Sequence, residues 1–225
     1  MWRAWRIYCR HWLGLGSVVL VVWAPIELLS AYLDANVFGD DNFLKFWRFS
    51  QMLENFIGII GTAGVIYVGS ESLAGRTVTF GGAIKAGFAA WGRLWWTRLL
   101  SGLLILGLLV FLILPGIFAL VALSLVEPVT VLEGVSGGIA IRRSFALTRG
   151  RFWFLLRLCL CAYSPCLLIL MVLGLPSVLL PVLNHWLIQA LIATVGDLIL
   201  AFVTLTLLVA YVRLSLEAGA GSRKV

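Results

Sequence analysis

The sequence predicts an all-α integral membrane protein with six transmembrane segments. Of its 225 residues, 62% are hydrophobic and only 12% are charged, whereas a soluble domain is about 45–50% apolar. The apolar residues also form runs as long as a membrane-spanning helix, which needs about 20 residues. A water-soluble fold of this size could not cover so much apolar surface with polar groups, so we exclude a soluble domain.

The third of five apolar runs decides the number of spans. It covers residues 94–126, too long for one straight helix at about 1.5 Å per residue in a hydrocarbon layer of about 30 Å. Pro115-Gly116 lies inside this run, and we expect the pair to close a helical hairpin, because proline removes a backbone donor and glycine permits a sharp turn. The predicted spans, within a single membrane domain of residues 1–225, are residues 12–33, 56–75, 94–114, 116–132, 152–173 and 186–212.

The distribution of basic residues favours six spans over five. Cytoplasmic loops of membrane proteins carry an excess of lysine and arginine. With six spans, every basic residue except Lys45 and Arg48 falls on the cytoplasmic side, which is 15 of the 17. With five spans, only 7 of the 17 do. We therefore expect a multi-pass protein of a bacterial cytoplasmic (inner) membrane, with both termini in the cytoplasm and an uncleaved first span.

A repeated pattern predicts two further helices at the cytoplasmic face. The stretch GGAIKAGFAAWGRLWW from Gly81 is echoed by GGIAIRRSFALTRGRFW from Gly137. Two copies of a parallel repeat lie on the same side of the membrane only if an even number of spans separates them. The predicted fold therefore has three helical hairpins, an internal parallel repeat and two interfacial amphipathic helices on the cytoplasmic side.

The segment from Leu114 to Leu156 carries a series of short motifs. They are Leu114-Pro115-Gly116, Glu127-Pro128-Val129, Leu132-Glu133-Gly134, Arg142-Arg143-Ser144 and Leu147-Thr148-Arg149-Gly150. Through them the chain resembles, over roughly residues 56–217, a bacterial membrane-domain family that occurs fused to glycerophosphodiester phosphodiesterases and as small stand-alone polytopic membrane proteins of unknown function. Hydrolysis in the fused relatives belongs to a separate soluble barrel. This chain has no polar segment long enough to form that barrel, so the activity is not carried over.

Three ionisable residues are predicted to form an intramembrane polar cluster. Asp197 and Glu127 are expected near the middle of their spans, whereas Arg157 is expected nearer the cytoplasmic face. Charged groups within the membrane are energetically costly, so each one suggests a functional site by default. The functional interpretation is a proton or cation relay or a polar substrate site. The structural interpretation, which we favour, is an ion pair between Arg157 and a carboxylate that fixes helix packing.

A cytoplasmic cluster of arginines is the second candidate site. Arginine and hydroxyl side chains of this kind can hold a lipid headgroup phosphate or an acidic partner. The competing interpretation is that the arginines only set the topology and contact headgroups. The residues of this cluster are Arg142, Arg143, Ser144, Thr148, Arg149 and Arg151.

Catalytic, metal and cofactor sites are not predicted. His11 and His185 are expected on opposite sides of the membrane, and the sequence has no metalloprotease, nucleotide-binding or paired-cysteine motif. The basic residues lie between apolar runs, which suits membrane lipids, including anionic ones, and argues against nucleic acid as a partner.

Three function hypotheses follow. The leading one is a non-enzymatic membrane protein that supports lipid or envelope metabolism by binding lipid, a protein partner or further copies of itself. The second is a small proton- or cation-coupled transporter that uses Asp197 and Glu127. The third is an intramembrane lipid-modifying enzyme, for which the sequence shows no nucleophile and base together.

Overall fold

The computed structural model describes residues 5–6, 8–9, 12–38, 49–50, 52–179 and 185–222. Their backbone is helical apart from short turns. Six helical segments within this part of the chain are long and apolar enough to cross a membrane, which confirms the predicted all-α class and the number of spans. These segments are Trp12–Val37, Glu54–Leu73, Phe80–Phe111, Ile113–Leu132, Phe152–Pro176 and Trp186–Ala218.

The helices follow one another with short connections. The first span is α2 (Trp12–Leu33) followed by the π-helical turn η1 (Asp34–Phe38), and the second is η3 (Glu54–Gly58) followed by α4 (Ile59–Leu73). The remaining elements are α5 (Phe80–Phe111), α6 (Ile113–Ala122), α7 (Val126–Leu132), α8 (Gly137–Thr148), α9 (Phe152–Leu179) and α10 (Trp186–Ser222).

The sharp corner of the predicted hairpin lies at Leu112 and not at Pro115-Gly116. Leu112 has an extended backbone, with φ −154° and ψ 114°, between the end of α5 and the start of α6. Pro115 lies in the first turn of α6, where a backbone N–H has no helical partner and its loss costs little. Gly116 faces Leu109, because a Cβ at this glycine would come within 2.5 Å of the leucine Cγ. The pair therefore tightens the hairpin after the chain has already turned.

The two copies of the sequence repeat have different backbones. The first copy and the span after it form one uninterrupted helix of 32 residues, α5, which Thr79 caps by accepting a hydrogen bond from the Gly82 N–H at 3.2 Å. A separate interfacial helix is therefore not present at this copy. The second copy does form a separate helix, α8, because Gly150 adopts φ 78° and breaks the chain before α9. That left-handed conformation is readily accessible to glycine alone.

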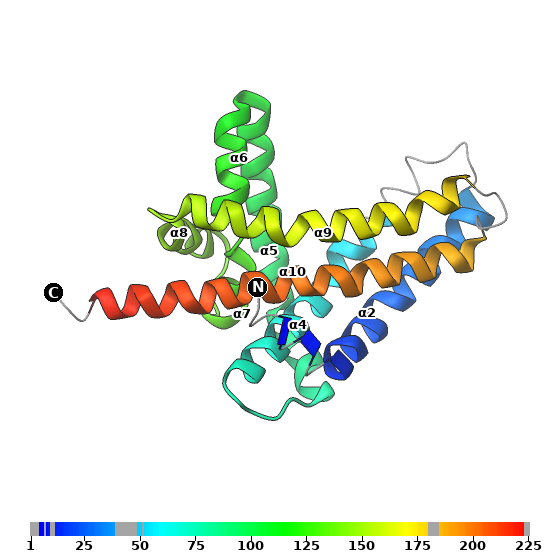
Figure 1. Ribbon diagram of the computed structural model, residues 1–225, viewed down its shortest axis with the longest axis horizontal. Helices are drawn as coiled ribbons and strands as arrows, with labels where there is room; N and C mark the ends of the chain where they lie inside the picture. The colour runs from blue at the N-terminus through cyan, green and yellow to red at the C-terminus, as the bar shows by residue number, and fades with distance from the viewer. Residues whose placement is uncertain are drawn as a thin grey trace.

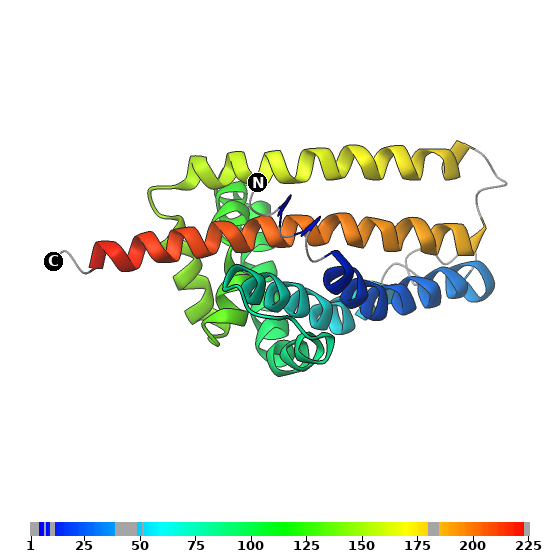
Figure 2. The same ribbon diagram turned by 60° about the horizontal axis from the view of Figure 1, so that its bottom comes forward.

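The long helices do not all run in one direction. Helices α9 and α10 extend along the length of the molecule, α2 runs obliquely to them, and the hairpin of α5 and α6 runs across them (Figure 1). The view in Figure 2 shows α9 and α10 alongside each other. Residues 110–114 at the hairpin corner are 64–85% exposed and apolar. Such a surface suits lipid tails, as expected of a membrane protein.

The main core lies where α2, α4, α7 and α10 meet. Fully buried side chains from these four helices pack together there, among them Val18, Ile66, Val129 and Leu208. Helix α9 joins α10 through a smaller apolar cluster that includes Ala162 and Leu207. The steeply crossing hairpin shares only part of this core, and the space beside the crossing contains the candidate site.

The sidedness of the protein stays a prediction. Of the residues on which that prediction rests, several lie outside the described part of the chain. They are Arg3, Arg10, Lys45, Arg48, Arg223 and Lys224.

Two glycines in α5 provide a test of the packing between α4 and α5. A Cβ at Gly87 would lie 2.5 Å from the Ile60 carbonyl oxygen, whereas a Cβ at Gly92 would meet nothing within 4 Å. We expect Gly87→Ala to lower the melting temperature of the detergent-purified protein by several degrees, since overpacking costs about 1–3 kcal/mol. Gly92→Ala should leave the melting temperature unchanged or raise it. Equal melting temperatures for the two variants would contradict the close approach of the helices.

Candidate functional site

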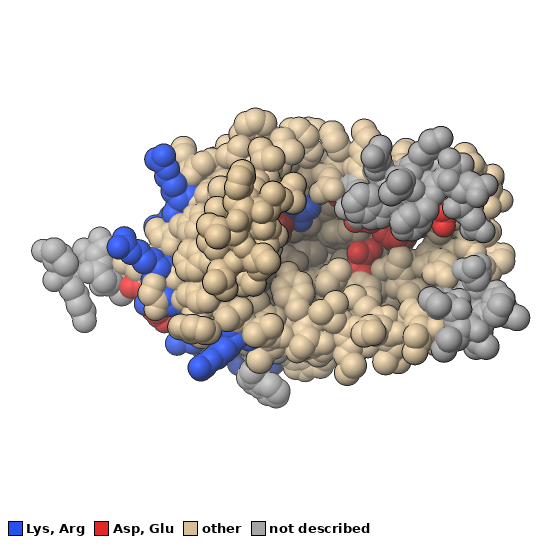
Figure 3. All heavy atoms as spheres, turned by 90° about the horizontal axis from the view of Figure 1, so that it is seen from above, with Lys and Arg blue, Asp and Glu red and all other residues tan. Residues whose placement is uncertain are grey.

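A polar hollow opens beside the α5–α6 hairpin. Its volume is about 370 Å³, which is within the range of roughly 300–1,000 Å³ found for small-molecule sites. Figure 3 looks onto the face from which the hairpin projects and shows acidic side chains along one side of the hollow and basic ones beside it. The polar residues that matter most in its lining are Glu54, Thr62, Arg98, Glu127, Tyr163 and Asp197.

An ion pair between Arg98 and Glu127 forms the wall of the hollow. Nε and Nη2 of Arg98 both lie 2.7 Å from Oε1 of Glu127. Nη2 also donates to the hydroxyl of Thr62 at 3.1 Å, and that hydroxyl donates in turn to the Gly58 carbonyl at 3.2 Å. Both charged side chains are only 28% exposed. One guanidinium therefore links α5 to α7 and to α4.

The hairpin geometry explains why this pair forms. Arg98 lies 14 residues before Leu112, and Glu127 lies 15 residues after it. In two antiparallel helices joined at a corner, residues equally far from the corner lie at the same level, here about 21 Å away at 1.5 Å per residue. The two side chains therefore meet across the hairpin.

Pro128 causes a break in the returning helix shortly before Glu127. Proline cannot donate to the carbonyl four residues earlier, and its ring clashes with that carbonyl. The chain accordingly leaves the helix between α6 and α7, and the Val126 N–H bonds to the Leu123 carbonyl at 3.0 Å. This shift releases the Ala122 carbonyl from the helical pattern, and it brings Glu127 into the first turn of α7.

Ser144 and Thr148 satisfy the released carbonyl. Both side chains are buried. The Ser144 hydroxyl donates to the Ala122 oxygen at 2.6 Å, and the Thr148 hydroxyl shares its one hydrogen between that oxygen at 3.2 Å and the Ser144 carbonyl at 2.9 Å. These two residues therefore fasten α8 onto the break between α6 and α7. Their hydroxyls are used in helix packing and do not face a headgroup, which departs from the predicted arginine and hydroxyl cluster.

Carboxylates dominate the other side of the hollow. Glu54 of η3 accepts a hydrogen bond from Ser50 at 3.4 Å, and Asp197 of α10 lines the same space. Oδ2 of Asp197 is buried and has no hydrogen-bond partner among the described residues. Glu27 of α2 adds a further acidic group, since it interacts repulsively with both other carboxylates.

Arg157 does not join the polar hollow. It is exposed on α9 and is not part of the lining, and no ion pair of Arg157 is found among the described residues. Helix α9 packs through Leu155 and Ala162, and Arg157 is two residues from the first of these, which turns it to another side of the helix. The partner of Glu127 is Arg98, so the predicted pair with Arg157 is replaced.

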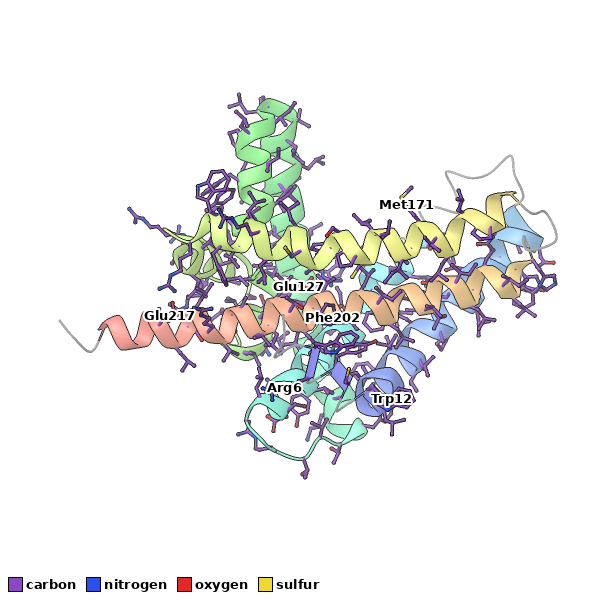
Figure 4. All side chains as sticks on the ribbon, in the orientation of Figure 1. Arg6, Trp12, Glu127, Met171, Phe202 and Glu217 are labelled. Atoms are coloured by element: carbon purple, nitrogen blue, oxygen red, sulfur yellow. The ribbon has the colours of Figure 1, made fainter. Side chains whose placement is uncertain are left out.

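The remaining arginines of the predicted cluster divide into paired and unpaired ones. Arg143 contacts Glu133 at 3.0 Å, and Tyr211 donates to the same carboxylate at 2.9 Å. Arg151 lies 2.7 Å from Glu217. Arg142 and Arg149 are exposed, with no ion pair within the described residues. Figure 4 shows Glu217 towards the C-terminal end of α10 and Glu127 in the middle of the molecule, so the basic cluster and the hollow are separate sites.

Two apolar grooves adjoin the hollow on either side of α5. One, of about 460 Å³, is lined by Ile105 and Leu120 among other residues. The other, of about 440 Å³, is lined by Leu103 and Leu106. Arg98 borders the hollow and both grooves. The site is therefore polar at one end and divides into two apolar branches.

Arg98 and Glu54 are site residues that the sequence analysis did not single out. Arg98 was counted among the cytoplasmic basic residues. Arg98 and Glu127 are almost equally far from the corner at Leu112, but they are 17 and 11 residues from the predicted corner at Pro115-Gly116, so the sequence did not indicate the pair. Glu54 becomes part of the site only because η3 lies against the hollow, and no sequence pattern indicates this. Among the described residues, no group of three or more histidines, cysteines and carboxylates is arranged to hold a metal ion.

Comparison of the chain with family models, curated proteins and solved structures finds no match. The resemblance noted from the motifs therefore stays a prediction.

The ion pair at the hollow should contribute more to the stability of the protein than an ion pair at the surface does. We expect Arg98→Gln and Glu127→Gln each to lower the melting temperature by several degrees, because a charge left alone in a partly buried site costs about 3–5 kcal/mol. The double variant should lose much less than the sum of the two. Arg151→Gln provides the control, since its ion pair with Glu217 has the same 2.7 Å separation but is 39% and 40% exposed, and Glu217 keeps Arg213 as a second partner at 3.0 Å.

The surface pair is expected to contribute at most about 1 kcal/mol. Strictly additive effects at Arg98 and Glu127, or equal effects at the two pairs, would show that the hollow does not depend on its ion pair.

Proposed function

We propose that this protein is a non-enzymatic membrane protein that supports lipid or envelope metabolism by binding a membrane lipid in the hollow beside Arg98. The observation that carries the proposal is the shape of the site. A polar hollow meets two apolar grooves at one arginine, Arg98. A lipid has the same division into a polar headgroup and apolar chains.

The charges of the hollow support a binding role. Arg98, Glu127 and Asp197 lie in helices that are long and apolar enough to cross a membrane. Charged groups at such positions are costly, and they commonly mark sites for substrates or ions. The Arg98–Glu127 pair holds three helices together, but packing does not account for Asp197, whose buried Oδ2 has no hydrogen-bond partner among the described residues.

The exposed arginines support a location beside anionic lipids. Arg142 lies on α8 next to the paired Arg143, and Arg149 follows the end of α8 two residues before the paired Arg151. Basic side chains near an anionic leaflet are each stabilised by about 1 kcal/mol. We therefore keep the inner membrane, with these arginines on the cytoplasmic side, as part of the proposal.

Coupled transport is the second candidate, favoured by Asp197. A carboxylate without a hydrogen-bond partner in a polar hollow can take up and release a proton or a cation. In vesicles that contain the purified protein, transport predicts proton or cation flux that Asp197→Asn abolishes while protein abundance is unchanged. Lipid binding alone predicts no such flux.

A change at one groove should remove the bound lipid and leave the ion pair intact. Gly102 lines the groove of Leu103 and Leu106, and a Cβ there meets nothing within 4 Å. The side chain of Gly102→Trp would therefore extend into the groove. We expect protein purified in mild detergent to retain phospholipid, measured by native mass spectrometry, and Gly102→Trp to retain at most about a tenth as much, the effect of roughly 1.4 kcal/mol.

Gly107→Trp is the matched control. Gly107 lies on the same helix, has equal free space around its Cβ and is not part of either groove. This variant should retain as much lipid as the unaltered protein. Unaltered protein that carries no phospholipid, or a Gly102→Trp variant that carries as much as Gly107→Trp, would overturn lipid binding at this site.

A further inference from the structure

The charge of the hollow discriminates among lipid headgroups. Among the described residues, its lining includes one basic side chain, Arg98, and three carboxylates, Glu54, Glu127 and Asp197. Arg98 is paired with Glu127, and Glu54 has partners of its own, so the carboxylate open to a ligand is Asp197, whose buried Oδ2 has no hydrogen-bond partner among the described residues. A headgroup that is only anionic would be repelled. A headgroup that carries a positive group would be attracted, since buried charges are stable when they are paired.

Arg98 can still bind a phosphate. Its Nε and Nη2 bind Glu127 and Thr62, whereas Nη1 has no hydrogen bond among the described residues. Arginine offers five N–H donors in a planar fork that suits phosphate oxygens. The hollow thus provides a donor for a phosphate at Arg98 and an acceptor for a cationic group at Asp197.

Both grooves extend from Arg98 along α5 towards the hairpin corner. Ile105 and Leu106 follow Arg98 by seven and eight residues on α5, towards the hairpin corner. They belong to different grooves, one on each side of the helix. At 1.5 Å per residue, both grooves reach roughly 10–12 Å beyond Arg98. The two acyl chains of a phospholipid whose phosphate lies at Arg98 would extend along the helix in the same direction as the two grooves.

We propose that the site binds one diacyl phospholipid whose zwitterionic headgroup ends in an amine, as in phosphatidylethanolamine. The ammonium group lies against Asp197, the phosphate lies against Arg98, and one acyl chain lies in each groove beside α5. This proposal rests on the proposed lipid binding and adds the headgroup class. A trimethylated choline headgroup has the same charge but no N–H to donate, so it cannot form hydrogen bonds with that carboxylate.

The first experiment compares headgroups on the unaltered, full-length protein. Delipidated protein is incubated with mixed micelles of phosphatidylethanolamine, its mono- and dimethylated forms, phosphatidylcholine and phosphatidylglycerol, all with the same acyl chains. The protein is then repurified and its lipid is identified by mass spectrometry. We expect about tenfold enrichment of phosphatidylethanolamine over phosphatidylglycerol, the effect of roughly one charge-assisted hydrogen bond. Binding should also fall stepwise with each added methyl group.

The second experiment changes the carboxylate. Asp197→Asn and Asp197→Ala should each abolish the preference for the amine while the total amount of bound lipid stays within about twofold. Asp34→Asn is the control, because Asp34 is an exposed acid at the end of α2 that is not part of the hollow lining. This control should keep the preference.

The outcomes separate the two proposals. If the unaltered protein binds none of the lipids, lipid binding itself fails. If it binds them without preference, or prefers phosphatidylglycerol or phosphatidylcholine, lipid binding stands and the amine headgroup is refuted. If the carboxylate variants do not fold, the methylation series on the unaltered protein still decides the question.

Discussion

The contact on which the rest of the structure depends is the one between the Arg98 guanidinium and the Glu127 carboxylate. It joins the outgoing and returning arms of a hairpin about 21 Å from its corner, and the additional bond to Thr62 attaches that hairpin to α4. An unpaired charge in this partly buried position would be strongly destabilising. The pair therefore fixes both the register of the hairpin and its attachment to the core.

The hollow is a consequence of how this hairpin is attached. Because the hairpin runs across α9 and α10, it cannot pack along their length. The break that Pro128 imposes between α6 and α7 presents Glu127 to Arg98 and leaves the Ala122 carbonyl for α8 to satisfy. The break therefore has two effects: it allows the ion pair with Arg98 to form, and it provides a carbonyl to which α8 bonds. Space remains beside the crossing, and Asp197 and Glu54 face it from α10 and η3.

Much of the fold was predictable because the relevant signals are local. Run length and the distribution of basic residues together predicted six spans, and the proline in the third run correctly indicated that the chain turns back there. The position of the corner was wrong by three residues, since a proline is tolerated in the first turn of the following helix as well as in the turn itself. The helix expected before residue 94 is continuous with the span after it because nothing in that copy of the repeat interrupts the helix, whereas Gly150 interrupts the other copy. Its interfacial location stays a prediction. Sequence patterns predicted Glu127 and Asp197 as intramembrane charges, but the choice of Arg98 over Arg157 depends on which side of α9 packs. That choice depends on tertiary contacts, which sequence patterns do not show.

The central claim is that the crossing of the hairpin creates a lipid site around Arg98, and photolabelling tests it most directly. A phosphatidylethanolamine with a diazirine on an acyl chain would be bound to the detergent-purified protein, activated by light and located by peptide mass spectrometry. We expect the label to concentrate on the groove residues between Leu99 and Leu123. Label spread instead over exposed apolar surface such as the part of α9 around Met171, which is 70% exposed (Figure 4), would contradict the claim.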